Sequence, residues 1–378
     1  MIRFIHELED WPRLHWDQEK ITPLFSTVRL RQGRLLGRME ALGFELREEA
    51  VLRTLTQDVV ESSSIEGEIL DKEQVRSSLA RRLGMDAYAL VPADRTVEGV
   101  VEMMLDATQL YAEPLTEERL FGWQTALFPT GRSGLTRLRI GAWRDDANGP
   151  MEVVSGPIGK ERIHFEAPAA VRLPSEMAVF LDWFNSEAPL LDPVIKAGLA
   201  HLWFVTIHPF DDGNGRIARA IADLALARSE ETGQRFYSLS AQIRKERKAY
   251  YDVLEATQHG DLDVTEWIIW FLGCLERALL GAEKTLGTVL KKAEFWKTYA
   301  QADLNERQRL ILNRLLDGFT GKLTSSKWAT IAKCSQDTAL RDISDLMERG
   351  ILRRDTAGGR STGYLLNNIA LAATHSGT

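Results

Sequence analysis

Apolar residues recur at the spacing of an α-helix along most of the chain, and no long run alternates between apolar and polar positions. The pattern therefore predicts a mainly α-helical fold. The segment from Pro193 to Ile207 is apolar on almost all sides, which indicates a buried helix, and another helix is expected to begin near Asn214. Further helices are predicted over residues 45–59, 71–83, 94–111, 115–127, 175–185, 241–258 and 264–299.

Two regions depart from this simple pattern. Residues 141–168 are rich in Gly and Pro and contain short β-branched and aromatic runs at 151–154 and 162–165, so a small irregular hairpin is expected there. Near the N-terminus, two tryptophans precede a basic amphipathic helix, and Gly43 is expected to cap its C-terminal end. This module is expected either to bury the basic helix against the core or to form a dimer contact.

Past Leu304 the sequence predicts three helices, at 306–317, 325–332 and 336–348, followed by two short strands. Three helices closed by a hairpin are typical of the winged-helix arrangement, a variant of the helix-turn-helix. Residues 303–367 carry eleven Lys and Arg against eight Asp and Glu, a balance of +3 in a chain whose net charge is −7. The expected domains are a helical N-terminal module (1–44), a helical segment (45–94), a helical core (95–300) and a winged helix-turn-helix (303–370).

The third helix of this C-terminal domain has the features of a recognition helix. Ser335 is expected to cap its start. Its expected inward stripe consists of Leu340, Ile343, Leu346 and Met347. The residues expected toward solvent are Gln336, Thr338 and Arg341, with Arg353, Arg354 and Arg360 in the wing. Such residues could contact bases and phosphates of DNA, but winged helices also dock proteins and the charge is modest, so both alternatives stay open.

The composition excludes several classes of protein. With 378 residues, 44% of them hydrophobic, the chain has enough apolar material for a sizeable core, which excludes a disordered chain and a disulfide mini-scaffold. Its two cysteines, Cys274 and Cys334, cannot build a metal cage. Neither an export signal nor a stretch of about 20 apolar residues, the length needed to span a bilayer, is found. We therefore expect a cytoplasmic protein without a membrane partner.

The stretch HPFDDGNGRIAR, from His208 to Arg219, carries the most chemical information. Gly213 and Gly215 allow positive φ angles and close backbone approach, so successive N–H groups can form an anion-binding nest at a helix N-terminus. Arg216 and Arg219 are three residues apart on that helix and can each direct two donors at phosphate oxygens. The pattern predicts a site for more than one phosphate.

Two further residues of this stretch suggest a reaction. Asp212 offers a hard oxygen suited to Mg²⁺. The pKa of an unperturbed histidine lies close to neutral pH, so His208 is suited to act as a general base. Together with the arginines they predict a metal-dependent transfer from a nucleoside polyphosphate. Asp211 is expected to be a solvated neighbour, and Asp223 on the following helix a surface charge.

This stretch matches every fixed position of the motif HxFx(D/E)GNGRxxR, so the sequence resembles the Fic family. The resemblance implies an α-helical Fic domain over roughly residues 95–275 and AMPylation, the transfer of AMP from ATP to a Ser, Thr or Tyr hydroxyl of a protein. It implies that His208 is the base, that Phe210 anchors the loop and that Asp212 holds Mg²⁺. The implied phosphate ligands are Gly213, Asn214, Gly215, Arg216 and Arg219.

The resemblance also implies sites outside the motif. The family's flap, which lines the site and aligns the target side chain, would correspond to Glu161, Arg162, Ile163 and His164. The adenosine would lie against Tyr250, Tyr251 and Gln258, although the tyrosines could instead simply pack the domain.

The segment Ser62-Ser-Ser-Ile-Glu66-Gly67 resembles the Fic inhibitory pattern (S/T)xxxE(G/N). Ser62 and Glu66 share a helix face. The resemblance implies that Glu66 reaches Arg219 and occupies the space of the γ-phosphate, and related enzymes use this glutamate to remove AMP from a target. The alternative is an ordinary polar helix end, with the serines as caps.

Two classes of function thus stand open. The first is a self-inhibited protein adenylyltransferase that acts on other proteins or on itself. The second is a DNA-binding regulator whose Fic core senses nucleotide or modifies the protein itself. Some relatives transfer UMP, phosphate or phosphocholine, and the sequence does not reveal the base of the donor.

Overall fold

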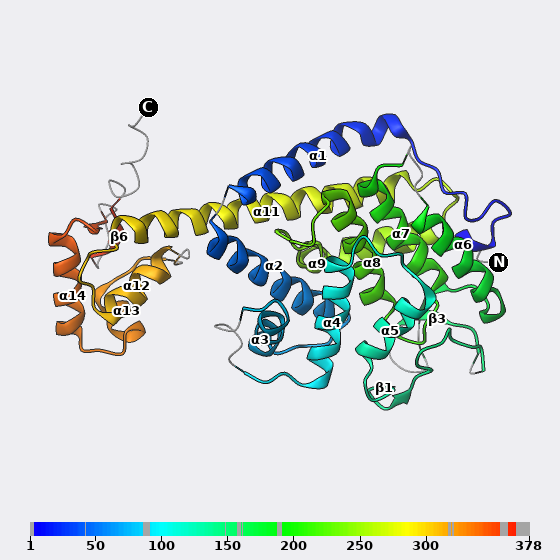
Figure 1. The fold of residues 1–378 in the computed structure, drawn as a ribbon, viewed down its shortest axis with the longest axis horizontal. Coiled ribbons are helices and arrows are strands. Elements are labelled where there is room, and N and C mark those ends of the chain that lie inside the picture. Colours follow the sequence, from blue (N-terminus) through cyan, green and yellow to red (C-terminus); the bar gives the residue numbers. More distant parts are fainter. Residues whose placement is uncertain are drawn as a thin grey trace. The chain divides into compact units, whose positions relative to one another are not determined.

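The computed structural model describes residues 4–41, 43–85, 91–147, 149–156, 160, 162–186, 191–316, 319, 321–355 and 362–367. It consists of two compact units, Met1–Ala282 and Glu283–Thr378, which are described separately (Figure 1). The mainly α-helical fold predicted from the sequence is confirmed. No helix of the described residues is long and apolar enough to cross a membrane.

The first unit contains most of the helices. Its elements are η1 (Ile5–Glu7), α1 (Gln18–Glu40), α2 (Phe44–Ile65), α3 (Lys72–Arg82), α4 (Arg95–Gln109), α5 (Glu117–Leu127), β1 (Arg132–Ser133), β2 (Thr136–Arg137), β3 (Glu152–Ser155), β4 (Arg162–Glu166), η3 (Ala170–Arg172), α6 (Leu173–Asn185), α7 (Pro193–Ile207), α8 (Asn214–Glu230), α9 (Leu239–Lys245), α10 (Arg247–Gln258) and the first part of α11 (Thr265–Thr298). The expected single helix over 241–258 is wrong, because the chain breaks at Glu246 between α9 and α10.

The centre of this unit is the pair α7 and α8, which pack against each other, while α2, α4 and α5 contact α8 (Figure 1). Asp192 caps α7 by accepting a hydrogen bond from the Val194 N–H at 2.8 Å, and Pro193 fits the first turn because it has no N–H to satisfy. Every residue of α7 from Ala197 to Ile207 is buried, as its apolar sequence predicts. The loop between α7 and α8 is therefore held from both sides by core helices.

Helix α2 lies beside α3, α8 and α9 and buries the apolar residues Leu52, Leu55 and Val59. The prediction that Gly43 caps the preceding helix is wrong. That helix, α1, ends at Glu40 with Ala41 as its C-cap, and Gly43 is the N-cap of α2 with extended backbone angles. Helix α2 ends at Ile65 with Glu66 as its C-cap, and the next residue, Gly67, adopts a φ of +86° and turns the chain.

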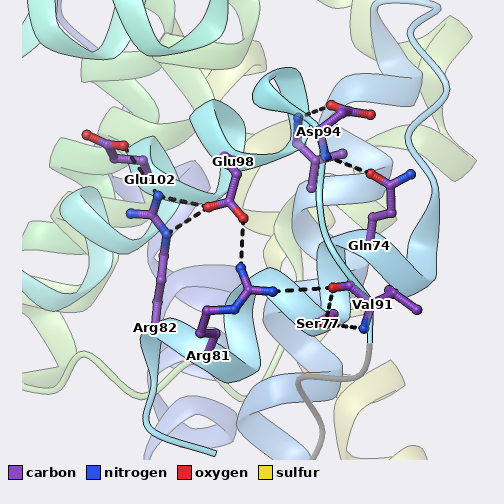
Figure 2. Close-up of polar contacts among 9 residues, drawn as sticks. Gln74, Ser77, Arg81, Arg82, Val91, Asp94, Glu98 and Glu102 are labelled. Atoms are coloured by element: carbon purple, nitrogen blue, oxygen red, sulfur yellow. Dashed lines mark hydrogen bonds and ion pairs between the residues drawn. The ribbon is translucent and has the colours of Figure 1, made fainter. Parts of the chain in front are cut away.

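Polar contacts join α3 to α4 and to the segment between them (Figure 2). Arg81 and Arg82 of α3 both pair with Glu98 of α4, at 3.2 and 3.0 Å. The buried Ser77 hydroxyl donates to the Val91 carbonyl at 2.7 Å and accepts from the Val91 N–H at 3.0 Å. Exposed ion pairs contribute at most about 1 kcal/mol each. The Ser77 contacts, which satisfy a buried hydroxyl, therefore fix this connection more firmly.

In the described part of the chain, the strands form separate two-stranded antiparallel pairs, β1–β2, β3–β4 and β5–β6. The hairpin expected near 151–165 is present as β3–β4, and its register shifts between Val153 and Val154. The β1–β2 pair was not expected from the sequence, because two-residue strands leave no periodic signal.

The second unit contains the end of α11, then α12 (Glu306–Leu316), α13 (Ser325–Ile331), α14 (Gln336–Glu348), β5 (Leu352–Arg354) and β6 (Tyr364–Leu366). Its core includes Trp328, Ile343 and Leu346. Ser335 caps α14 as predicted, accepting from the Thr338 N–H at 3.2 Å. The inward position assigned to Leu340 is wrong, because its side chain is 41% exposed and its neighbour Ala339 is buried instead.

Candidate active site

The loop after α7 is shaped by its own residues. Asn214 accepts a hydrogen bond from the Phe210 N–H at 3.0 Å and donates to the Phe210 carbonyl at 2.7 Å, which closes the loop. The Phe210 ring is fully buried beside Trp143. Gly213 has a φ of +88°, and a Cβ there would lie 3.0 Å from Phe128 Cε2, so both backbone angle and space favour glycine. The loop therefore presents His208 and the start of α8 in one fixed arrangement.

His208 ends α7 in the left-handed conformation, with a φ of 52°. Its Nδ1 lies 3.2 Å from the Val205 carbonyl. Because a carbonyl can only accept, we assign the proton to Nδ1, which leaves the Nε2 lone pair available. Burial lowers the pKa of His208 to about 4, against the opposing effect of the Val205 hydrogen bond. At neutral pH the imidazole is therefore uncharged and able to take a proton.

Arg219 is buried and held by the end of α2. Its Nε donates to Ser62 Oγ at 2.9 Å, its Nη2 donates to the Ser62 carbonyl at 2.9 Å, and its Nη1 lies 2.8 Å from Glu66 Oε1. Burial alone would lower the pKa of Arg219, but the Glu66 carboxylate together with Tyr250 and Tyr251 outweighs that effect, and the pKa is raised. The contact between Glu66 and Arg219 expected from the sequence is thus present.

Arg216 has a carboxylate partner of its own. Its Nη1 forms a short ion pair with Glu68 Oε2, and its guanidinium lies 4.9 Å from the centre of the Phe128 ring. The side chain is 5% exposed, and its Nε has no hydrogen-bond partner among the residues that the structure describes. A buried donor without a partner is costly, so this atom indicates a place for an additional anion.

Glu66 also occupies the nest at the start of α8. A Cβ built on Gly215 would lie 2.2 Å from Glu66 Oε1, which shows how closely the carboxylate approaches the backbone there. A helix N-terminus attracts negative charge through its free N–H groups and its dipole. The carboxylate of Glu66 therefore stands where the sequence predicts a phosphate.

A hollow of about 410 Å³ opens beside this nest. Its lining includes Glu66, Glu68, Phe128, Asp212 and Arg216. Asp212 Oδ1 accepts from the Gly213 N–H at 2.6 Å, and its Oδ2 has no hydrogen bond within the described part of the chain. No group of three or more His, Cys, Asp or Glu that could hold a metal ion occurs among these residues. A single carboxylate beside a phosphate site nevertheless fits Mg²⁺, which usually takes one or two carboxylates plus substrate phosphates.

The residues expected to contact adenosine lie on α10 and are not part of this lining. Tyr250 is 2% exposed, and its Oη shares a hydrogen bond of 2.9 Å with Nε2 of the buried His201. Gln258 is also buried and donates to Thr206 Oγ1 at 3.3 Å. Tyr251 is 37% exposed and is therefore the member of this group that is most accessible to solvent.

The expected flap corresponds to β4. Arg162 and the 45% exposed Ile163 lie on this strand, and Arg162 forms a short ion pair with Glu255 of α10. His164 joins the same carboxylate through Nδ1 at 2.7 Å. Glu161 lies outside the described residues.

Several features were missed or misjudged from the sequence. Asp223 is not a surface charge, because it is 2% exposed and accepts from Arg235 Nη2 at 3.0 Å. Asp211 is more than a solvated neighbour, since its Oδ2 accepts from the Arg139 N–H at 2.7 Å. Glu68 was overlooked because it lies outside the six-residue inhibitory pattern. A search for any carboxylate next to that pattern would have found it.

Comparison with known proteins places this geometry in context. Residues 114–226 match the model of the Fic/DOC family, and residues 4–85 match a model described as a domain of unknown function, DUF4172. Protein adenylyltransferase Fic of Nematostella vectensis is 35% identical over 113 residues, which is 30% of this chain and 25% of that protein. Protein adenylyltransferase fic-1 of Caenorhabditis elegans is 41% identical over 83 residues, which is 22% of this chain and 15% of that protein. The chain thus spans a quarter or less of these curated relatives.

A solved structure extends the likeness in fold. The crystal structure of a Fic family protein from Desulfovibrio desulfuricans G20 superposes with a TM-score of 0.52 at 22% identity, covering 92% of this chain and 96% of that chain. At this identity the likeness shows a shared fold.

Proposed function

Since the chain contains a Fic domain, we propose that it is a protein adenylyltransferase that transfers AMP from ATP to Ser, Thr or Tyr hydroxyls of proteins. The observation that carries the proposal is the juxtaposition of an uncharged His208 with a phosphate seat made by the α8 N-terminus, Arg216 and Arg219. A base beside a polyphosphate site is the minimum that such a transfer needs.

In the proposed reaction His208 Nε2 takes the proton of the target hydroxyl. The hydroxyl oxygen attacks the α-phosphorus of ATP, the bond from that phosphorus to the bridging β-oxygen breaks, and pyrophosphate leaves. The N–H groups at the start of α8 and the guanidinium of Arg216 hold the phosphates and balance the charge that moves onto the leaving group. Asp212 would hold Mg²⁺, which when bound neutralises charge on the phosphates.

The remaining site residues enter the proposal in supporting positions. Arg162, Ile163 and His164 of β4, with Glu161 before them, would align the target. Tyr251 would meet the adenosine, with Tyr250 and Gln258 behind it. The exposure of Ile163 and Tyr251 supports these roles.

We further propose that the enzyme restrains itself through two carboxylates. Glu66 neutralises Arg219 and fills the nest beside Gly215, as its contacts suggest. Glu68 neutralises Arg216 in the same way. Without these carboxylates, Nη1 of each arginine would be available for adjacent phosphates, so release of the inhibition requires the turn around Gly67 to move away from α8.

Labelled ATP tests the proposal. A Glu66→Gly variant incubated with a cell lysate is expected to attach label from the α-phosphate of ATP, and none from the γ-phosphate, to protein, including this chain itself. His208→Ala in the same background is expected to abolish the labelling, while His15→Ala, which removes an exposed histidine, serves as the control. Attachment of the γ-label, or no label despite measurable ATP binding, would contradict AMP transfer. Competition with unlabelled UTP reports the base of the donor.

A second function, DNA binding by the C-terminal unit, is supported by one observation. Gln336 and Arg341 are exposed on α14, the helix capped by Ser335. A gel shift with random duplex DNA, weakened by salt and by Arg341→Ala, is the expected result. An unshifted duplex at low salt would leave this unit as a candidate for protein docking.

A further inference from the structure

We propose that Arg144 is a positioning residue for the transfer, because its guanidinium fixes the backbone of the base His208 and joins it to the end of the flap strand β4. This inference rests on the proposed function. Arg144 lies in the irregular segment before β3 and is outside both the Fic motif and the inhibitory pattern.

The side chain of Arg144 is fully buried and uses all of its nitrogens. Nε donates to the His208 carbonyl at 2.8 Å, Nη2 donates to the Pro168 carbonyl at 2.6 Å, and Nη1 donates to Asp146 Oδ1 at 2.9 Å. The Arg144 backbone N–H also donates to the Pro209 carbonyl at 2.9 Å. One residue therefore holds two consecutive carbonyls of the catalytic loop.

These bonds act where the loop is strained. His208 adopts a φ of 52°, a conformation that side chains other than glycine rarely take and that persists only where the surroundings enforce it. The Nε bond fixes the peptide on the C-terminal side of this residue, and so it fixes the direction in which the imidazole leaves the backbone. The N–H bond to Pro209 fixes the next peptide. Without these contacts the loop can relax, and Nε2 loses its alignment.

The bond from Nη2 to the Pro168 carbonyl connects the base to the flap. Pro168 follows β4 by two residues, and β4 is the strand expected to align the target. Because one rigid, planar guanidinium contacts both carbonyls, the distance between base and strand is set by a single group. A lysine has no such planar fork and is not expected to hold both carbonyls in the same geometry.

Arg144 also acts on the charge of His208. Its positive charge disfavours the protonated imidazole and lowers the pKa of His208, whereas the carboxylates of Glu66 and Asp212 act in the opposite direction. Removing the guanidinium is therefore expected to raise the pKa of His208, while a lysine at the same position is expected to preserve most of the charge effect. Position and charge can thus be tested separately.

The experiment compares Arg144→Lys and Arg144→Met in the Glu66→Gly background, with Arg139→Met as control. Arg139 lies on the same segment, but its side chain is half exposed and pairs with Asp145. Both Arg144 variants are expected to lower kcat for AMP transfer at least tenfold while the Kd for ATP changes less than threefold. The acid limb of kcat/KM is expected to move to higher pH in Arg144→Met only.

Two outcomes would overturn the inference: a kcat within threefold of the parent in Arg144→Lys, or a loss of ATP binding as large as the loss of kcat. If Arg144→Met does not fold, the lysine variant alone decides.

If the Glu66→Gly parent transfers no AMP, the proposed function fails, but the inference about Arg144 can still be tested. The test is then the titration of the His208 imidazole, followed by NMR in full-length Arg144→Lys and Arg144→Met. An unchanged His208 signal and titration in both variants then refutes it.

Discussion

The two carboxylates that follow α2 make the sharpest prediction, since each pairs with a different arginine of the phosphate seat. The perturbation is the removal of one negative charge with little change in shape, by Glu66→Gln, by Glu68→Gln, or by both. If both carboxylates compete with the phosphates of ATP, each single variant is expected to bind ATP more tightly and to transfer AMP faster. A Glu66→Gly change alone would leave Arg216 engaged and the enzyme only partly released.

The magnitude follows from the contacts. A hydrogen bond to a charged group contributes about 1.5–3 kcal/mol, and both glutamates are about one third exposed, 33% for Glu66 and 34% for Glu68, so the lower value is appropriate. About 1.5 kcal/mol corresponds to roughly a tenfold change in the Kd for ATP. The double variant is expected to gain between roughly tenfold and a hundredfold, because neighbouring contacts on one turn are not additive.

Isothermal titration calorimetry with ATP measures the Kd, and α-labelled ATP measures the transfer. Glu73→Gln, which removes an exposed glutamate from the first turn of α3, is the matched control and is expected to change neither. A Glu68→Gln variant with unaltered Kd and transfer rate, beside an activated Glu66→Gln, would refute the second carboxylate and leave inhibition to Glu66 alone.

Two more predictions follow from buried charges. In the Glu66→Gly variant the transfer rate is expected to stay level from pH 8 to about 6, because the pKa of His208 is about 4 and the imidazole stays unprotonated in that range. The rate should fall only as the pH drops through this pKa, and a pH–rate profile with an acid limb near 7 would contradict the lowered pKa. Arg235→Met is expected to lower the free energy of unfolding by about 3–5 kcal/mol, because Asp223 and Glu230 would remain buried without their partner. Denaturant unfolding measures this loss, and Lys248→Met, which removes one member of an exposed ion pair, is the control.

The parts of the site that the sequence predicted are those encoded locally. The glycines of the loop, the helix start at Asn214 and the shared face of Ser62 and Glu66 all depend on spacing within a few residues, and the structure has these features. The burial of α7 could likewise be predicted from its apolar sequence alone.

The parts that could not be predicted depend on tertiary contacts. Asp223 lies on a helix that is buried on nearly every side, so helical spacing gave no polar face on which to place it, and its partner Arg235 comes from the connection that follows α8. Arg144 lies in an irregular segment where no periodicity constrains the side chain. Glu68 reaches Arg216 only because Gly67 turns the chain after α2.

The contacts of α2 also define how much of the protein has to move for the proposed inhibition to be released. Asp58, two turns before Glu66 on the same face of α2, accepts a short hydrogen bond from Ser238 Oγ and another from the Ser240 N–H at 3.2 Å, both at the start of α9. These bonds do not involve Arg216, Arg219 or the start of α8, so ATP binding does not require them to break. In the proposed inhibition, only the turn from Ser62 onward would compete with the phosphates. We therefore expect release to be a local unwinding at the end of α2, which costs far less than separating the whole helix from the core.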